Sequence, residues 1–323
     1  MTNFPGKAPA SFDFTEILYD KRDWVATVTI NRPDKYNAYT YRTLQEMTQA
    51  FRDAAWDDQI AVVVLTGAGD KAFCTGGDVK EYADEYTERP RDYWKWMGLF
   101  VECHDMLRNI GKPTIARLNG MVVGGGNEFN MACDLAIAAD HVRIRQVGTE
   151  VGSVAAGGAT QWLPLMVGDR RAREILWLCE WVDAAKALEW GLVNQVVPYT
   201  KLDDAVATMA AKLVDKFPEC MRYTKQHTNF WKDFAWSQTV GHAREWLALH
   251  YASLEPYEGM HAFVNKRRPD HLGVRERAAS GGSSEFVWGP YSQRCPACGA
   301  EGIPAEFAYC GRCGERLTPA RDQ

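Results

Sequence analysis

The chain has 323 residues, of which 46% are hydrophobic, and a formal net charge of −5. This length predicts one or two domains, and the apolar fraction is sufficient for a substantial core. The acidic balance argues against a nucleic-acid binder. No segment approaches the ~18 apolar residues of a membrane span, and the N-terminal segment lacks the apolar stretch of a signal peptide. We therefore expect a soluble, cytoplasmic protein.

Strand-like and helix-like segments alternate along the first two thirds of the chain. Apolar runs typical of strands occupy residues 13–31, 60–70, 113–120 and 135–140, and helical periodicity covers residues 39–58 and 90–110. This alternation predicts βαβ units with a largely parallel sheet, an α/β fold. After Pro198 the pattern becomes helical, and helices are expected over residues 201–216, 218–233, 236–253 and 256–266.

Two glycine-rich stretches, FCTGGD (73–78) and VVGGGNE (122–128), each follow an expected strand and precede an expected helix. The first N–H groups of a helix are unpaired and point outward, and glycine lets a ligand approach the backbone closely. One such loop alone would be an ordinary turn. Two loops aimed at one point would form an oxyanion hole, a pair of amide donors that stabilises developing negative charge.

Four cysteines near the C-terminus have the spacing of a metal site. Cys295, Cys298, Cys310 and Cys313 form two C-x2-C pairs separated by eleven residues, which suits four thiolates around a structural Zn²⁺. A pair of disulfides or redox dithiols is the alternative, and an intracellular setting disfavours it. We therefore expect a zinc ribbon over residues 292–318, joined by a flexible linker (271–291) to a main domain (13–270).

Four ordered motifs of the main domain resemble the crotonase (enoyl-CoA hydratase/isomerase) superfamily. They are NRPDKYNAY (31–39), AFCTGGDVKEY (72–82), KPTIARLNGMVVGGGNEFNMACDLAIAAD (112–140) and AKALEWGLVNQVVP (185–198). The resemblance implies a ββα spiral core with a C-terminal helical trimerisation region. It also implies acyl-CoA thioester substrates, with coenzyme A as part of the substrate, and a homotrimer or hexamer.

The resemblance assigns roles to the glycine loops. The backbone N–H groups that match the family's oxyanion hole belong to Gly77 and Gly125, and Glu128 matches the first of the two glutamates of an enoyl-CoA hydratase. The second glutamate is replaced by Gly148. The acid–base pair of ordinary hydration is therefore incomplete. Glu128 could alternatively be an acid in the first turn of a helix, favoured there by the helix dipole.

The stretch VGTEVGSVAAGGATQWLPLMVG (147–168) resembles a subgroup that contains naphthoyl-CoA synthases and ring-opening hydrolases. Ala155 stands where the synthases have an aspartate. The whole pattern is most similar to 6-oxocyclohex-1-ene-1-carbonyl-CoA hydrolase, which adds water to a ring enone and then cleaves the ring. Ser153, Glu150 and Tyr86 are candidates to assist proton transfer. A turn residue, a surface charge and a packing residue, respectively, are the alternatives.

The resemblance also suggests residues that bind coenzyme A. These residues are Lys35, Asn37, Ala38, Thr75, Gly76 and Asp78, together with Lys266 and Arg267, which could come from a neighbouring subunit. Asp78 could instead fix its loop, and the basic run 265–270 could be a solvated helix end. The tryptophan and tyrosine residues within 93–96 could cover an acyl pocket or belong to the core.

Three functions remain open at this stage. The first is a hydratase and ring-opening C–C hydrolase that acts on an alicyclic acyl-CoA. The second is a general enoyl-CoA hydratase or isomerase with one catalytic carboxylate. The third is a non-catalytic acyl-CoA-binding subunit whose zinc ribbon docks a partner protein.

Overall fold

The computed structural model describes residues 6–87, 89–281, 293–304 and 307–317. Its chain divides into two compact units. The main unit contains residues 1–78, 95–150 and 154–245, and the second unit contains residues 79–94, 151–153 and 246–323. The predicted linker and zinc ribbon fall in the second unit, and their residues 282–292, 305–306 and 318 lie outside the described residues.

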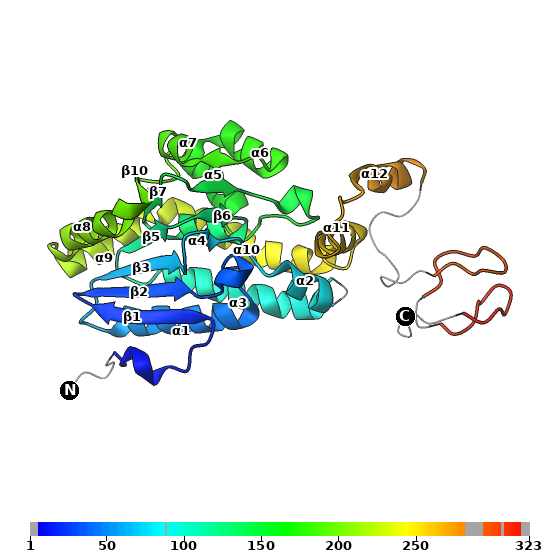
Figure 1. The fold of residues 1–323 in the computed structure, drawn as a ribbon, viewed down its shortest axis with the longest axis horizontal. Helices are drawn as coiled ribbons and strands as arrows, with labels where there is room; N and C mark the ends of the chain where they lie inside the picture. The colour runs from blue at the N-terminus through cyan, green and yellow to red at the C-terminus, as the bar shows by residue number, and fades with distance from the viewer. Residues whose placement is uncertain (1–5, 88, 282–292, 305–306, 318–323) are drawn as a thin grey trace. The chain divides into compact units, whose positions relative to one another are not determined.

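A six-stranded sheet forms the centre of the main unit (Figure 1). Its order is β1 (Ile17–Arg22), β2 (Val25–Ile30), β3 (Val62–Gly67), β5 (Thr114–Leu118), β7 (Leu135–Ala139) and β10 (Gln195–Val197). Only the β1–β2 pair is antiparallel, so the expectation of a largely parallel sheet is confirmed. All six residues of β3 are buried, as expected for a central strand that is covered on both faces.

A smaller sheet carries the glycine loops. Its strands run in the order β4 (Ala72–Cys74), β6 (Met121–Val123), β8 (Arg143–Arg145) and β9 (Val182–Asp183). Strands β4 and β6 are parallel neighbours. Because parallel strands end at the same edge of a sheet, the segments that follow β4 and β6 emerge side by side. This pairing brings the two glycine-rich stretches of the sequence together.

Helices surround both sheets of the main unit. They are α1 (Tyr41–Trp56), α4 (Gly125–Ala132), α5 (Ala159–Val167), α6 (Asp169–Leu178), α7 (Ala184–Glu189), α8 (Leu202–Val214) and α9 (Pro218–Thr228), with most of α3 (Pro90–Arg108) and α10 (Phe230–His250). The α9–α10 junction lies before the position expected from the sequence. Asn229 separates the two helices, and its buried side chain donates a hydrogen bond to the Arg108 carbonyl at 3.2 Å.

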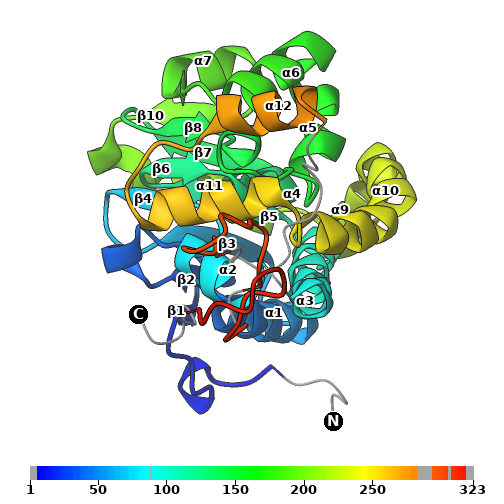
Figure 2. The same cartoon turned by 90° about the vertical axis from the view of Figure 1, so that its right-hand side faces the viewer.

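The second unit is mostly helical in its described part. Helix α2 (Val79–Glu85) packs against α11 (Leu254–Val264), and both are visible in Figure 2. Helix α12 (His271–Ala279) occupies the start of the segment that the sequence analysis treated as a linker. Asp270 explains this difference, because its side chain accepts a hydrogen bond from the Gly273 N–H at 2.9 Å and caps the helix. Residues 271–279 of the expected linker are therefore helical.

Candidate active site

The two glycine loops are in direct contact. Gly76 has a φ of +91°, and a Cβ at this position would lie 3.3 Å from the Gly125 nitrogen. A Cβ on Gly126 would collide with the Cys74 carbonyl group. Both loops can therefore approach each other this closely only because these positions lack side chains.

The amides of Gly77 and Gly125 are available as donors. Neither N–H makes a hydrogen bond within the part of the chain that the structure describes. Gly125 is the first residue of α4, where no preceding helical turn can accept its proton. Gly77 and Gly125 are also partly accessible, whereas the adjacent Gly76 and Gly126 are buried. This arrangement has the features of an anion-binding pair, and α4 adds the positive end of its dipole.

Glu128 lies in the first turn of α4 and is 5% exposed. Burial raises the pKa of its carboxyl group to about 7, and hydrogen bonds from the backbone of Ala159 and Gly157 oppose this rise. The Ala159 N–H lies 3.1 Å from Oε1 of Glu128. Because the pKa lies near neutral pH, the carboxyl group can both accept and release a proton under ordinary conditions.

Two glycines, Gly157 and Gly158, pack against the side chain of Glu128. A Cβ on Gly157 would lie 3.1 Å from Oε2 of Glu128 and would collide with the Phe100 ring. Gly158 has a φ of +137° and precedes the first residue of α5. The turn therefore brings the start of α5 against the carboxylate. The buried rings of Phe100 and Trp162 lie against the same two glycines and make the surroundings of Glu128 apolar.

Gly148 and Glu150 form a short 3-10 helix in the main unit. The side chain of Glu150 is 49% exposed and forms an ion pair with Arg145. The Arg145 guanidinium in turn lies 5.0 Å from the centre of the Trp181 ring. This environment suits a surface charge better than a proton donor at a reaction centre, and a catalytic role for Glu150 stays a prediction.

Ser153 and Tyr86 belong to the second unit. The hydroxyl oxygens of Ser153 and Tyr251 lie 3.3 Å apart, and the Tyr86 hydroxyl donates to Glu81 at 2.8 Å. Tyr251 is 1% exposed, and its ring stacks on that of Tyr93 at 3.6 Å. Burial raises the pKa of Tyr251, so its phenol is protonated at neutral pH. Tyr251 was not predicted from the sequence, because nothing in the local sequence links positions 153 and 251.

Most of the predicted CoA-binding residues near the first loop hold that loop in place. The Asn37 side chain is fully buried and donates to the carbonyls of Ala68 and Ala72 at 3.0 and 2.7 Å. Arg32 donates to the Ala38 carbonyl and lies 3.0 Å from Asp78. The Thr75 hydroxyl donates to the Tyr36 carbonyl at 3.2 Å, and Lys35 is exposed. Their role in binding CoA stays a prediction.

The basic residues after α11 differ in their environment. The Arg267 guanidinium forms a two-pronged ion pair with Glu258, in which Nη2 and Oε2 lie 2.6 Å apart. Lys266 is exposed and has a φ of +54°. Lys266 is therefore the more available of the two positive charges for a phosphate group.

Gln146 is a further residue of the main unit that sequence reasoning missed. The side chain of Gln146 is buried and donates a hydrogen bond to the Gly124 carbonyl at 3.3 Å. The Gly124 N–H donates to the Arg145 carbonyl at 3.0 Å. Strand β8 and the residue after it therefore anchor the base of the second loop.

The four predicted metal-ligand cysteines come together at the C-terminus. Their sulfur atoms all lie within 4.8 Å of one another. Cys295 and Cys313 have a sulfur separation of 3.5 Å, and Cys298 and Cys310 have one of 3.7 Å. Four thiolates bound tetrahedrally to Zn²⁺ would be about 3.8 Å apart. The donor set therefore fits a closed zinc site, and the cluster is compatible with a small zinc ribbon.

The two halves of this cysteine module repeat one backbone pattern. The Gly299 N–H donates to the Cys295 carbonyl, and the Gly314 N–H donates to the Cys310 carbonyl, at 3.0 and 2.8 Å. Both glycines have positive φ, which the turn requires. Among the described residues of the module, the apolar core consists of four buried residues, Cys295, Ile303, Cys310 and Leu317. A core of this size would usually need a bound metal for stability.

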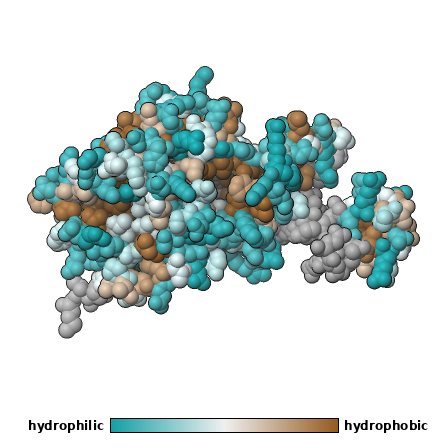
Figure 3. Space-filling model, in the orientation of Figure 1, coloured by the Kyte–Doolittle hydropathy of each residue, from teal (hydrophilic) through white to brown (hydrophobic). Residues whose placement is uncertain are grey.

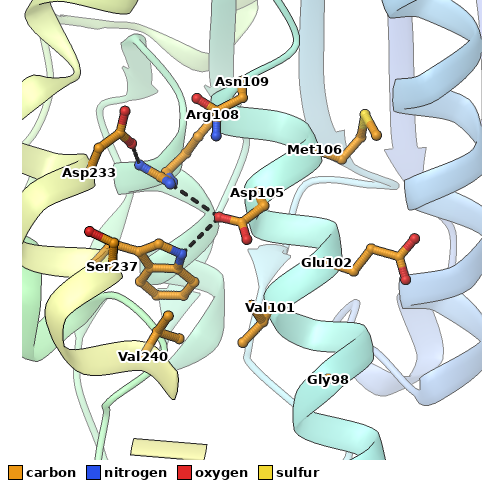
Figure 4. Close-up of a pocket in the computed structure, with 11 residues that line it drawn as sticks. Gly98, Val101, Glu102, Asp105, Met106, Arg108, Asn109, Asp233, Ser237 and Val240 are labelled. Carbon is orange, nitrogen blue, oxygen red and sulfur yellow. Dashed lines mark hydrogen bonds and ion pairs between the residues drawn. The ribbon is translucent and has the colours of Figure 1, made fainter. Parts of the chain in front are cut away.

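A separate groove of about 760 Å³ lies between α3 and α10 in the main unit (Figure 4). Its charged side chains largely pair with one another. Arg108 is bonded to Asp105 and Asp233, and the Trp236 Nε1 donates to Asp105 at 2.7 Å. Because these groups already have partners, we assign no binding role to the groove.

Comparisons with known proteins identify the family and the solved structures that this chain resembles. Residues 20–273 match the family model of enoyl-CoA hydratase/isomerase. The chain is 32% identical to Pseudomonas aeruginosa DspI over 74% of this chain and 96% of that one, with a TM-score of 0.66. It is 29% identical to an enoyl-CoA hydratase from Bacillus anthracis, over 80% and 100% of the two chains, with a TM-score of 0.63. For a carnitinyl-CoA hydratase from Mycobacterium avium, the identity is 28%, the coverage 79% and 97%, and the TM-score 0.67.

The α/β architecture is therefore a crotonase fold, with a helical C-terminal region. The chain belongs to the enoyl-CoA hydratase/isomerase family. The cysteine module lies beyond residue 273, outside the match to the family model. Among the described residues, no helix is long and apolar enough to cross a membrane.

Proposed function

We propose that this protein adds water to an alicyclic, 6-oxocyclohexene-type acyl-CoA and then cleaves the ring, as a crotonase-type hydratase and C–C hydrolase. The observation that carries the proposal is the buried carboxyl group of Glu128, whose pKa is raised to about 7, in the same helix as Gly125. Family membership supports an acyl-CoA thioester as the substrate class. The pattern of residues 147–168 favours the ring-opening subgroup.

The backbone amides of Gly77 and Gly125 would bind the thioester oxygen. Both donors are unpaired in the described chain, and their loops touch. As water adds to the conjugated double bond, charge moves onto this oxygen and an enolate develops. Loss of one such amide donor typically costs about 3–4 kcal/mol of transition-state stabilisation.

Glu128 would act as the general base. In its ionised form it takes a proton from water, and the resulting hydroxide attacks the β-carbon of the enone. The proton then passes from Glu128 to the α-carbon, which restores the thioester. One carboxyl group can perform both transfers because its pKa lies near neutrality. These two transfers need no second glutamate, which is consistent with Gly148 at that position.

Ring cleavage uses the same pair of backbone amides and the same general base, Glu128. A second water, deprotonated by Glu128, attacks the ring ketone. The bond between the ketone carbon and the α-carbon then breaks, so that a carboxylic acid forms at the former ketone. The electron pair of the broken bond remains on the α-carbon as a thioester enolate, which the two amides stabilise until it is protonated. Ser153 and Tyr86 are proposed to assist these proton transfers, and Glu150 is the least supported of the three.

The substrate's CoA portion is proposed to lie against the 35–38 segment and the first glycine loop, near Thr75, Gly76 and Asp78. Lys266, with Arg267, would supply positive charge for the phosphates. We also propose a homotrimer or hexamer. Large side chains such as Phe217 and Trp231 are 80% and 65% exposed, and apolar areas interrupt the hydrophilic surface in Figure 3. Such surface is typical of contacts between subunits.

A general enoyl-CoA hydratase or isomerase is the second candidate, favoured by the similarity to a hydratase from Bacillus anthracis. Mass spectrometry distinguishes the two candidates after incubation with crotonyl-CoA and with a cyclic enone-CoA. Gain of two waters on the cyclic substrate supports ring cleavage. Gain of one water on crotonyl-CoA alone favours the general hydratase. No conversion of either ester, despite tight binding, favours a non-catalytic acyl-CoA-binding subunit.

The cysteine module is proposed to bind one structural Zn²⁺ through Cys295, Cys298, Cys310 and Cys313. All four ligands would be supplied by the protein, so the metal would have no open position and no part in the reaction. Zinc ribbons also serve as docking modules, and a protein partner is the role that we propose for this one. Metal analysis of the purified protein should give about one equivalent of zinc.

A further inference from the structure

Tyr39 contacts both loops that carry the amide donors. Its backbone pairs with the first loop. The Tyr39 N–H donates to the Gly76 carbonyl, and the Tyr39 carbonyl accepts from the Asp78 N–H, both at 2.9 Å. Together these two hydrogen bonds form a parallel bridge that is centred on Gly77. The position of the Gly77 amide is therefore fixed by Tyr39 from both sides.

The side chain of Tyr39 reaches the second loop. Its hydroxyl oxygen occupies the space that a Cβ on Gly125 would need, and its Cζ would lie 2.8 Å from such an atom. The phenol therefore packs directly against the residue that carries the second donor. No other described side chain comes as close to the Cβ position of Gly125 as that of Tyr39.

The ring of Tyr39 is itself held rigidly. Tyr39 is 3% exposed, and its ring lies edge-on to Phe129 at 5.5 Å and beside Phe100 at 5.8 Å. Arg32 links the segment of Tyr39 to the first loop, because it bonds both the carbonyl of Ala38, the residue before Tyr39, and the carboxylate of Asp78. A residue with so little freedom can transmit the position of one loop to the other.

We propose that Tyr39 is a positioning residue that sets the spacing between the amide donors of Gly77 and Gly125. This inference rests on the proposed oxyanion hole. Oxyanion donors are effective only when both lie at hydrogen-bonding distance from one oxygen, so a small displacement weakens the binding of an enolate. Tyr39 should therefore govern the binding of a developing enolate and leave the binding of the CoA portion unchanged.

The experiment compares two ligands in the full-length protein. Acetoacetyl-CoA can bind as its enolate, which absorbs in the near ultraviolet, whereas free CoA has no thioester. Dissociation constants for both are measured for the wild type, Tyr39→Leu and Tyr39→Phe. Tyr39→Phe is the matched control because it keeps the ring. We expect Tyr39→Leu to raise the dissociation constant of acetoacetyl-CoA at least about tenfold and to change that of CoA by no more than about twofold. Tyr39→Phe should raise the dissociation constant of acetoacetyl-CoA less.

Two results would overturn the proposal. One is a folded Tyr39→Leu protein that retains the wild-type preference for acetoacetyl-CoA and its enolate absorbance. The other is an equal loss of affinity for both ligands, which would indicate a purely structural role. If the wild type itself shows no preference and no enolate absorbance, the oxyanion hole is wrong and the role of Tyr39 falls with it. If the wild type prefers acetoacetyl-CoA and only Tyr39→Leu loses this preference, the result supports both the oxyanion hole and the positioning role of Tyr39.

A second pair of variants tests the proposal if Tyr39→Leu does not fold. Gly125→Ala introduces a methyl group that collides with the Tyr39 hydroxyl, so it should abolish the preference for acetoacetyl-CoA. Adding Tyr39→Phe to Gly125→Ala removes the nearest colliding atom. The preference for acetoacetyl-CoA over CoA should then be at least about threefold greater than in Gly125→Ala alone. Effects that simply add, with no restoration, would contradict the contact on which the proposal depends.

Discussion

The surroundings of Glu128 and the cysteine module differ in how much of each is buried and in what the burial does. Glu128 is buried in the large core of the main unit, which makes its charged form costly and raises its pKa to about 7. In the described part of the cysteine module, four residues form the buried core, and Cys313 is exposed. The large core therefore raises the pKa of one side chain to near neutrality, whereas the small module would depend on a bound metal for stability.

This difference indicates where each region is vulnerable. The main unit can tolerate the change of one catalytic group, because its fold rests on many apolar contacts. The module should not tolerate loss of one thiolate if it binds zinc as proposed, because the metal would supply most of its folding free energy. The predictions below test this contrast, beginning with the largest effect.

Removal of the metal should unfold the module and leave the main unit intact. Structural zinc contributes on the order of 10 kcal/mol to small zinc modules. We expect Cys310→Ser, or a strong chelator, to abolish zinc binding and to remove the amide-exchange protection of residues 293–317. Hydrogen exchange measured by mass spectrometry provides the readout. Cys220→Ser is the matched control, because Cys220 is exposed and far from the cluster in sequence. An equally protected module without zinc would contradict the assignment.

Glu128→Gln should reduce turnover by about 10²–10⁴-fold, the usual contribution of a general base. The amide has nearly the same shape, so the fold and the affinity for CoA esters should persist. In the wild type, kcat/KM should rise with pH and level off above about pH 7, because only the ionised carboxylate accepts a proton. The assay is a pH profile of both proteins. Turnover of the variant within about threefold of wild type would remove Glu128 from the chemistry.

The raised pKa of Glu128 also predicts a pH dependence of stability. The folded state binds this proton more tightly than the unfolded state, whose pKa is near the ordinary 4.5. The wild type therefore has this stabilisation in full below pH 4.5 and loses it as the pH rises through about 7. Glu128→Gln does not titrate, so its stability relative to wild type should increase by at most about 2–3 kcal/mol from pH 4.5 to 8. Urea unfolding at both pH values measures the difference, and a constant difference would argue against a raised pKa.

Glu150→Gln should have the smallest effect. Its ion pair with Arg145 is half exposed, and such pairs contribute about 0–1 kcal/mol. We expect kcat and the unfolding free energy to change little. Steady-state kinetics beside those of Glu128→Gln gives a direct comparison of the two carboxylates. A loss of turnover comparable to that of Glu128→Gln would show that Glu150 takes part in catalysis.

Local sequence patterns predicted the parts of the molecule that depend on local rules. The two C-x2-C pairs identified the cysteine cluster, and the buried runs of residues 60–70 and 113–120 identified β3 and β5. The glycine stretches indicated both loops because glycine is needed where backbones approach closely. The family resemblance then supplied the acyl-CoA class, which neither spacing nor composition contains.

The remaining features depend on contacts between distant residues. The raised pKa of Glu128 results from burial against α3 and α5, and no pattern around residue 128 shows it. The pairing of Ser153 with Tyr251 joins segments about one hundred residues apart. Asp270 was not identified as a helix cap, because the charged stretch that follows it has little helical periodicity. The role of Tyr39 could not be predicted from the motif that contains it, because its contacts with both glycine loops are visible only in the folded structure.

The central claim is that Gly77 and Gly125 polarise a thioester carbonyl. The most direct measurement is the ¹³C resonance of a carbonyl-labelled acyl-CoA bound to Glu128→Gln, in which turnover is slow. Two amide donors withdraw electron density from the carbonyl, so the account predicts a clear downfield shift relative to the free ester. A bound ester whose carbonyl resonates at the position of the free ester would contradict it.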